Sequence, residues 1–200
     1  MSATLPTIYL ARHGETAWTV TGQHTGLTDL PLLPEGEAAA GKLGSRLAGL
    51  KVAKVYTSPL KRARYTCAIA GFGEVAEVDS DLVEWDYGDY EGLRSAEIRE
   101  RNPGWKLFRD GAPGGESVAA ITARADRVVN RVRAINEDVL LFSSGHFLRV
   151  LATRWIGLEI NPACLSFLLS TASLSALSYE HDLTRPVVKL WNDTNHLRSA

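Results

Sequence analysis

Residues 7–16 read TIYLARHGET, in which a short β-branched and aromatic run gives way to polar residues at Arg12. The pattern predicts a strand over residues 7–11 that is buried on both faces. Two further short apolar runs, residues 52–56 and 139–142, also end in polar clusters, and each is followed by a helical pattern. Because strands alternate with helices, the chain is predicted to be an α/β three-layer sandwich with a mostly parallel central sheet.

The remaining elements follow from hydrophobic periodicity and turn residues. Helices are predicted over residues 35–50, 60–70, 95–101, 117–135 and 147–156, and closing strands over residues 173–179 and 187–191. In the longest helix Arg124, Arg127 and Arg131 lie off the apolar face, which indicates a solvated face near Asp126. No internal repeat or interdomain linker occurs, so residues 1–200 are expected to form a single domain.

Composition narrows the class of protein. Lys and Arg number 22 against 23 Asp and Glu, a formal net charge of −1, which argues against a nucleic-acid partner. No apolar run long enough to span a membrane and no signal-peptide pattern occur, so a cytoplasmic protein without a membrane partner is expected. The two cysteines, Cys67 and Cys164, are far apart, so no metal site is expected. The oligomeric state stays open, a homodimer included.

The polar residues that follow three predicted strands indicate one shared site. In open parallel sheets ligands bind beyond the carboxyl ends of the strands. The residues are Arg12 and His13 after the first strand, Ser58 and Arg62 after the second, and Ser144 and His146 after the third. A ligand pocket is therefore predicted where these three strands end.

His13 beside Arg12 suits an anion site. A neutral imidazole can attack phosphorus and form a phosphohistidine. The guanidiniums of Arg12 and Arg62 can hold the non-bridging oxygens of one phosphate by paired hydrogen bonds. Taken singly, the tripeptide RHG is more often a surface loop and Arg62 a solvated helix residue. The recurrence of an arginine after a second strand favours the anion site.

The motifs resemble the histidine phosphatase superfamily. In chain order they are LARHGETAW (10–18), GQHTGLTD (22–29), YTSPLKRARYTC (56–67), LVEWDYGDYEGL (82–93) and SSGHFLR (143–149). They are similar to the phosphoglycerate-mutase-like branch, and the resemblance runs from the first predicted strand to the last. It implies the α/β sandwich of that branch and phosphoryl transfer through a phosphohistidine, with no metal and no other cofactor.

The resemblance assigns roles to individual residues. His13 falls on the nucleophile, and Arg12 and Arg62 fall on the two arginines that grip phosphate. Thr25 and Gly26 match the loop whose backbone amide often contacts phosphate in this family. We therefore expect these five residues to surround the phosphoryl group.

The resemblance places Glu84 on the acid that protonates the leaving oxygen. An alkoxide is a poor leaving group, so a positioned carboxylic acid lowers the barrier. The same carboxylate can then deprotonate the water that hydrolyses the phosphoenzyme. Only the motif register selects Glu84 from neighbouring carboxylates such as Asp81 and Asp86.

The last motif departs from the family pattern SHGxxxR. Counting back five residues from Arg149 reaches Ser144, so a serine stands where the second catalytic histidine is expected. A serine hydroxyl can donate a hydrogen bond to phosphate but carries no imidazolium charge. We expect Ser144 to lie in the phosphate pocket and His146 to line its rim. The rival hypothesis is that a shifted loop lets His146 replace the missing histidine.

The resemblance favours a phosphatase that acts on a phosphorylated sugar or a similar small metabolite. Mutases of the family insert a segment with an adjacent basic pair that holds a second phosphate. Here the segment 101–117 is short, and Lys106 and Arg109 are not adjacent. The chain looks more like the sugar-phosphate and broad-range acid phosphatases, which include sedoheptulose-bisphosphatase-like members. A mutase is one alternative, and a phosphate-binding relative weakened by Ser144 is another.

Overall fold

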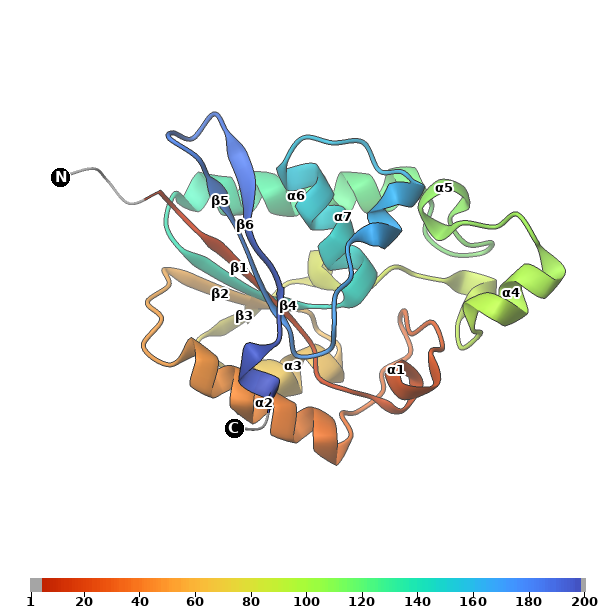
Figure 1. Ribbon diagram of the computed structural model, residues 1–200, viewed down its shortest axis with the longest axis horizontal. Helices are drawn as coiled ribbons and strands as arrows, with labels where there is room; N and C mark the ends of the chain where they lie inside the picture. The colour runs from red at the N-terminus through yellow and green to blue at the C-terminus, as the bar shows by residue number, and fades with distance from the viewer. Residues whose placement is uncertain (1–4, 199–200) are drawn as a thin grey trace.

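The computed structural model describes residues 5–198 of the chain. A six-stranded sheet, in the order β3-β2-β4-β1-β5-β6, lies between two layers of helices (Figure 1). The strands are β1 (Ile8–Arg12), β2 (Lys54–Thr57), β3 (Ala76–Val78), β4 (Val139–Ser143), β5 (Leu174–Tyr179) and β6 (Pro186–Asp193). Strands β1 to β4 run parallel, whereas β5 is antiparallel to both β1 and β6. The predicted α/β sandwich with a mostly parallel sheet is confirmed.

Helices cover both faces of this sheet. α2 (Pro34–Leu47) and α3 (Lys61–Ile69) lie on one face, and α6 (Val118–Ile135) and α7 (Gly145–Trp155) lie on the other (Figure 1). Short helices α1 (Ala17–Thr21), α4 (Ser95–Arg101) and α5 (Leu107–Asp110) gather beyond one end of the sheet. Turns of 3-10 helix span Ser80–Leu82, Gly88–Tyr90, Pro162–Ser166 and Asn195–Leu197.

Some predicted boundaries were wrong, and three elements were missed. The helix predicted to reach residue 50 ends at Leu47, because Ala48 leaves helical geometry and Gly49 takes a φ of +78°. Leu50 nevertheless packs against the core on that face, which explains its helical spacing. The missed elements, α1, β3 and α5, have five, three and four residues, which is too short for periodicity to reveal.

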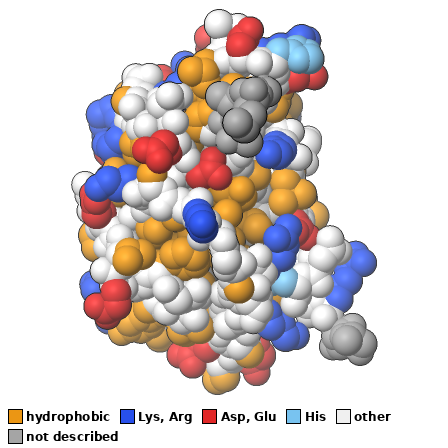
Figure 2. All heavy atoms as spheres, turned by 90° about the vertical axis from the view of Figure 1, so that its left-hand side faces the viewer, with side chains coloured by type: hydrophobic (Ala, Val, Ile, Leu, Met, Phe, Trp, Pro, Cys, Tyr) orange, Lys and Arg blue, Asp and Glu red, His pale blue; other side chains and the backbone are white. Residues whose placement is uncertain are grey.

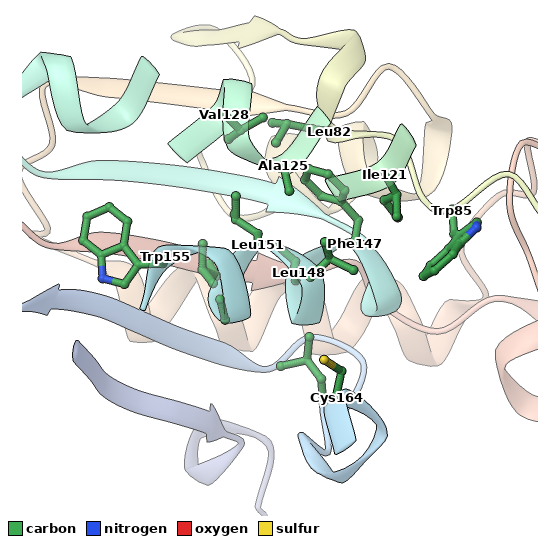
Figure 3. Packing of buried hydrophobic residues seen from close by; sticks show 14 of the residues in the cluster. Leu82, Trp85, Ile121, Ala125, Val128, Phe147, Leu148, Leu151, Trp155 and Cys164 are labelled. Atoms are coloured by element: carbon green, nitrogen blue, oxygen red, sulfur yellow. The ribbon is translucent and has the colours of Figure 1, made fainter. Parts of the chain in front are cut away.

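The larger core cluster lies between the sheet, α6 and α7. Figure 3 shows Ile121, Ala125 and Val128 of α6 directed toward side chains of α7, among them Phe147. All four are buried, so the predicted apolar face of the longest helix is correct. The packing of α7 against this face fixes the position of its first turn, which lies at the carboxyl end of β4.

Arg124 corrects the prediction that the arginine row of α6 is solvated. Its side chain is only 9% exposed and pairs with Glu116, whereas the side chain of Arg127 is 58% exposed. Burial of a cation is tolerated when a carboxylate and hydrogen bonds compensate for lost hydration. The polar partners of Arg124 lie outside α6, so the hydrophobic periodicity of that helix could not predict its burial.

Figure 2 views the end of the molecule where the parallel strands begin. Hydrophobic side chains on this face are interrupted by Lys, Arg, Asp and Glu (Figure 2). A groove between α2 and the β5–β6 pair is lined partly by Tyr9, Leu50, Leu174 and Leu190. Across residues 5–198, no helix combines the length and the apolar character needed to cross a bilayer.

Candidate active site

The carboxyl ends of β1 and β4 open into a pocket of about 280 Å³. Its walls include residues 18–25, which comprise most of α1 and the turn after it, the segment from Glu84 to Tyr87, and the first turns of α7. Residues of α4 and α5 lie at its far side. Among the residues singled out from the sequence, the lining contains Arg12, His13, Thr25, Glu84 and His146. The pocket therefore lies at two of the three predicted strand ends, whereas Arg62, Gly26 and Ser144 are not among the residues that line it.

His13 is a buried imidazole with one ring nitrogen engaged. Its Nδ1 lies 2.7 Å from the carbonyl oxygen of Gly14, so Nδ1 carries the proton and donates it. Nε2 is then left with its lone pair. Burial, followed by the positive charges of Arg62 and Arg12, holds the pKa of His13 well below its usual range. The imidazole is therefore neutral at neutral pH, which is the form that can act as a nucleophile.

Three other segments hold the backbone around His13. The His13 amide donates to Ser143 at the end of β4, and the His13 carbonyl accepts from Ala172, each at 3.0 Å. The Gly14 amide donates to the hydroxyl of Thr66 on α3 at 2.9 Å. A Cβ at Gly14 would lie 2.5 Å from a backbone oxygen of α2, so only glycine fits there. The histidine is thus pre-positioned rather than carried on a mobile loop.

Arg62 is fully buried and Arg12 is half-buried, and backbone carbonyls orient both guanidiniums. The Nη atoms of Arg62 donate to three carbonyls of the segment 25–28 at 2.7–3.1 Å, and an Nη atom of Arg12 donates to Leu169. Within residues 5–198, neither Nε atom has a hydrogen-bond partner. Burial lowers the pKa of Arg12 to about 10, which still leaves it charged at neutral pH. Two fixed cations with free donors are suited to bind an anion.

The loop at Thr25 and Gly26 has a different arrangement from the expected one. The Gly26 amide donates to both carboxylate oxygens of Glu91, at 2.8 and 3.0 Å, so it is already engaged. Thr25 lines the pocket. The carbonyls of both residues orient Arg62. The loop therefore acts on the site through Arg62, and a phosphate contact from the Thr25 amide stays a prediction.

Glu84 is buried and caps the start of α7. Its Oε1 accepts from the amides of Trp85 and Phe147 at 2.9 and 2.7 Å, and its Oε2 accepts from the amide of His146 at 2.9 Å. Free amides at a helix N-terminus attract a negative charge. The carboxyl group is thereby fixed at the wall of the pocket rather than free to rotate.

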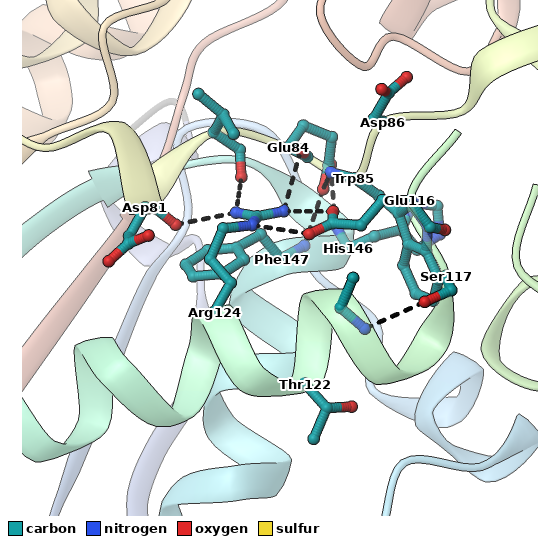
Figure 4. A network of polar contacts seen from close by, with 12 residues as sticks. Asp81, Glu84, Trp85, Asp86, Glu116, Ser117, Thr122, Arg124, His146 and Phe147 are labelled. Carbon is teal, nitrogen blue, oxygen red and sulfur yellow. Dashed lines mark hydrogen bonds and ion pairs between the residues drawn. The ribbon is translucent and has the colours of Figure 1, made fainter. Parts of the chain in front are cut away.

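The neighbouring carboxylates have other partners. Asp81 pairs with Arg127 and Arg131 of α6, and the hydrogen bond from Arg127 lowers the pKa of Asp81. Asp86 accepts from the amide of Gly88 at 3.0 Å. Figure 4 shows Asp81 and Asp86 directed away from the amides that hold the Glu84 carboxylate. Of these three carboxylates only Glu84 lines the pocket, which agrees with the residue that the motif register selected.

Ser144 is the N-cap residue of α7, yet its hydroxyl does not cap the helix. The amides that an N-cap side chain normally binds are taken by Glu84. Ser144 is only 1% exposed, and within the described part of the chain its Oγ has no partner. The hydroxyl is thus a buried donor at the end of β4, but Ser144 is not among the residues that line the pocket, so its place beside the phosphoryl group stays a prediction.

His146 lines the pocket and is bound to an aromatic cluster. Its Nδ1 lies 2.5 Å from the hydroxyl of Tyr87, and its ring lies 5.5 and 5.9 Å from those of Phe108 and His24. Burial, followed by the charge of Arg149, holds the pKa of His146 well below its usual range. The side chain is therefore a neutral, tethered part of the wall.

Two further residues, Tyr87 and Arg149, line the pocket, although the sequence pattern did not mark them as site residues. Arg149 lines the pocket, and its Nε has no partner in the described residues, although it served only as a register marker for Ser144. Tyr87 lines the pocket and orients His146. The signal for both was their place in the motifs: Tyr87 follows Glu84 in the same motif, and Arg149 lies one turn after the start of α7.

Acid should destabilise the fold through the pocket histidines. Burial lowers the pKa of His24 to about 4. Between pH 6.5 and pH 4, His24 is therefore protonated in the unfolded chain but neutral in the folded chain. Stability is therefore retained above pH 6.5 and lost as the pH falls toward 4. For His24 alone the loss approaches about 3 kcal/mol. Thermal unfolding at pH 7.5 and 5 should show it, and His24→Gln should reduce the dependence.

The matched control for this prediction is His181→Gln, because the His181 side chain is 72% exposed. That variant should keep the pH dependence of the unmodified protein. A melting temperature that falls equally in His24→Gln and in the unmodified protein would contradict the assignment.

The pocket at the carboxyl end of the parallel strands thus brings together a neutral buried imidazole, an arginine and a carboxyl group, which are the kinds of group that phosphoryl transfer uses. The chain belongs to the histidine phosphatase superfamily (branch 1), whose family model matches residues 8–194. The chain is 40% identical over 185 residues to an acid phosphatase of Mycobacterium tuberculosis, with 90% of each protein covered. It is 33% identical to the sedoheptulose 1,7-bisphosphatase of Saccharomyces cerevisiae, covering 95% of this chain and 80% of the relative.

Comparison with solved structures agrees with this membership. The structure of an open reading frame product of Mycobacterium tuberculosis has a TM-score of 0.88 at 38% identity, and the match covers 94% of this chain and 97% of that one. The resemblance inferred from the ordered motifs is confirmed, as is the fold of the phosphoglycerate-mutase-like branch.

Proposed function

We propose that the protein is a phosphatase that hydrolyses the phosphomonoester of a sugar or a similar small metabolite, through a phosphohistidine on His13 and without a metal ion. The observation that carries the proposal is the neutral, buried imidazole of His13 with Nε2 free beside Arg12 and Arg62. The relatives named acid phosphatase and sedoheptulose 1,7-bisphosphatase support the substrate class.

The first step transfers the phosphoryl group to the protein. The Nε2 lone pair of His13 attacks phosphorus, a P–N bond forms and the ester P–O bond breaks. Glu84, as a carboxylic acid, gives its proton to the leaving oxygen, so the product is a neutral alcohol. Arg12 and Arg62 stabilise charge on the non-bridging oxygens as the transition state forms.

The second step restores the protein. A water molecule attacks phosphorus, and the Glu84 carboxylate takes a proton from it. The P–N bond breaks, its electron pair returns to Nε2 of His13, and inorganic phosphate leaves. Both the imidazole and the carboxylic acid are thereby regenerated for the next turnover.

Arginines supply the charge that a metal ion supplies in other phosphoryl-transfer sites. Arg12, Arg62 and Arg149 each bring an Nε donor that has no partner within residues 5–198. Fixed guanidiniums bind phosphate oxygens with good geometry and stay charged at any physiological pH. The positive charge of these three arginines supports the proposal that the reaction needs no metal ion.

The proposal is tested by phosphate release from p-nitrophenyl phosphate, and from a panel of sugar mono- and bisphosphates, in EDTA at mildly acidic pH. We expect turnover to persist in EDTA. Turnover restored only by added Mg²⁺ would contradict metal independence. Isomerised product without free phosphate would support a mutase, and binding without turnover would support a weakened phosphate-binding protein.

Ser144→His should raise kcat. The Ser144 hydroxyl is an unpartnered donor among the described residues, but it lacks the charge of an imidazolium. A charged hydrogen bond is worth about 1.5–3 kcal/mol, so the gain should be roughly 10- to 100-fold. Steady-state kinetics on a sugar phosphate measures it.

The companion variant is His146→Ala, which should cause only modest harm because His146 is tethered to Tyr87. If Ser144→His leaves kcat unchanged and His146→Ala abolishes turnover, the assignment is reversed and His146 is the second catalytic histidine.

A further inference from the structure

Arg124 on α6 is a buried cation whose five N–H groups all have acceptors (Figure 4). Nε and Nη2 donate to the two carboxylate oxygens of Glu116 at 2.9 and 2.6 Å. Nη1 donates to the carbonyls of Asp81 and Val83 at 2.8 and 2.7 Å, and Nη2 also donates to the carbonyl of Glu84 at 3.2 Å. The side chain thus binds the backbone that carries Glu84.

The segment bound by Arg124 has an irregular backbone. Its 3-10 turn ends at Leu82, and the carbonyls that follow join no strand. Buried carbonyls need donors, and the Leu82 carbonyl accepts from the hydroxyl of Ser143 at 2.6 Å. Side-chain donors therefore hold every carbonyl from residue 81 to residue 84, and Arg124 supplies three of these four contacts.

Glu116, the partner of Arg124, binds the residues that follow Glu84. Its carbonyl accepts from the indole N–H of Trp85 at 2.7 Å, and its amide donates to the carbonyl of Asp86 at 2.9 Å. The Glu116 carboxylate is bound bidentately by Arg124. The ion pair therefore fixes the chain both before and after the residue that bears the candidate acid.

Arg124 also contacts the residue that receives the Glu84 carboxylate. Its guanidinium lies over the Phe147 ring, 4.5 Å from the ring centre. The amide of Phe147 donates to Oε1 of Glu84 at 2.7 Å. One guanidinium thus ties together the backbone that carries the Glu84 carboxyl group and the helix turn against which that group is held.

We propose that Arg124, held by Glu116, is a positioning residue that fixes the Glu84 carboxyl group at the wall of the pocket for proton transfer. The catalytic part of this proposal rests on the proposed function of Glu84. The alternative is a purely structural ion pair between α6 and the segment 81–86, which would affect the fold without favouring any one chemical step.

The experiment compares Arg124→Gln with Arg127→Gln. Arg127 lies one turn further along the same helix and pairs with the Asp81 carboxylate, so its loss removes a tether without touching the backbone around Glu84. Arg124→Gln should lower kcat on a sugar phosphate by roughly 10-fold or more, because a small displacement of a catalytic group is costly. Its effect on p-nitrophenyl phosphate should be much smaller, and Arg127→Gln should change neither.

A double variant separates positioning from folding. If Arg124 acts through Glu84, then adding Arg124→Gln to Glu84→Gln should cost little further activity. Equal losses on both substrates, or full additivity with Glu84→Gln, would overturn the proposal. Arg124→Lys keeps the charge but loses the planar fork, and it replaces Arg124→Gln if that variant does not fold.

A second measurement does not depend on turnover. Hydrogen exchange at the amides of Trp85, His146 and Phe147, which bind the Glu84 carboxylate, should be faster in the Arg124 variant and unchanged in Arg127→Gln. Unchanged exchange in the Arg124 variant would overturn the positioning role. If Glu84→Gln affects all substrates equally, the acid assignment fails, and exchange still decides whether Arg124 holds the carboxyl group.

Discussion

His13→Ala is expected to abolish phosphate release and to leave no phosphate bound to the protein. The imidazole is the only protein group in the proposed chemistry that forms a bond to phosphorus, and alanine offers no lone pair. Loss of a covalent nucleophile should lower kcat by about 10³-fold or more. Rapid quenching into base after mixing with labelled substrate should trap acid-labile, base-stable phosphate on the unmodified protein and none on His13→Ala.

His24→Gln serves as the matched control for this prediction. His24 also lines the pocket, but its Nε2 lies 3.1 Å from the hydroxyl of Ser95, so it is bound to α4. Labelling should persist in this variant. Label that persists in His13→Ala would show that another residue carries the phosphoryl group.

Glu84→Gln should reduce turnover of sugar phosphates by about 10²- to 10⁴-fold, the range typical of general acid catalysis. Glutamine keeps the shape of the side chain but cannot supply an acidic proton. The effect on p-nitrophenyl phosphate should be far smaller, because its phenolate leaves without much help. The ratio of kcat values on the two substrates is the measurement.

The control for Glu84→Gln is Asp86→Asn, which changes a carboxylate of the same segment whose partner is the amide of Gly88. It should leave the ratio unchanged. An equal loss on both substrates in Glu84→Gln would mean that Glu84 does not protonate the leaving oxygen, and Asp81 and Asp86 would then be the carboxylates to test.

The strand-end residues could be predicted from sequence because their positions follow from local rules. A short apolar run that stops at Arg12 indicates a buried strand and also marks its end. The carboxyl ends of parallel strands meet at one edge of a sheet. The same rule applied to β4 indicated that Ser144 and His146 would lie at that edge. The alternation of elements, read together with this rule, was enough to predict both the fold and the place of the pocket.

The protonation and the hydrogen bonding of the site residues depend on segments that are far away in the chain. His13 is neutral because burial and Arg62, which lies 49 positions further along, disfavour its protonated form. The Gly26 amide is engaged because Glu91 folds back onto it. Neither pairing can be predicted from the hydrophobic periodicity of the segment in which it occurs.

The sequence by itself determined the sandwich, the pocket at the strand ends and the order of the motifs, because periodicity and turn residues act over a few neighbouring positions. Only the tertiary structure decided that Arg124 is buried and that Glu84, among several nearby carboxylates, is held against the first turn of α7. The reason is that burial and hydrogen-bond partners arise from packing between distant segments. Arg124 and Arg127 have similar local surroundings, yet only Arg124 meets the irregular backbone of residues 81–84.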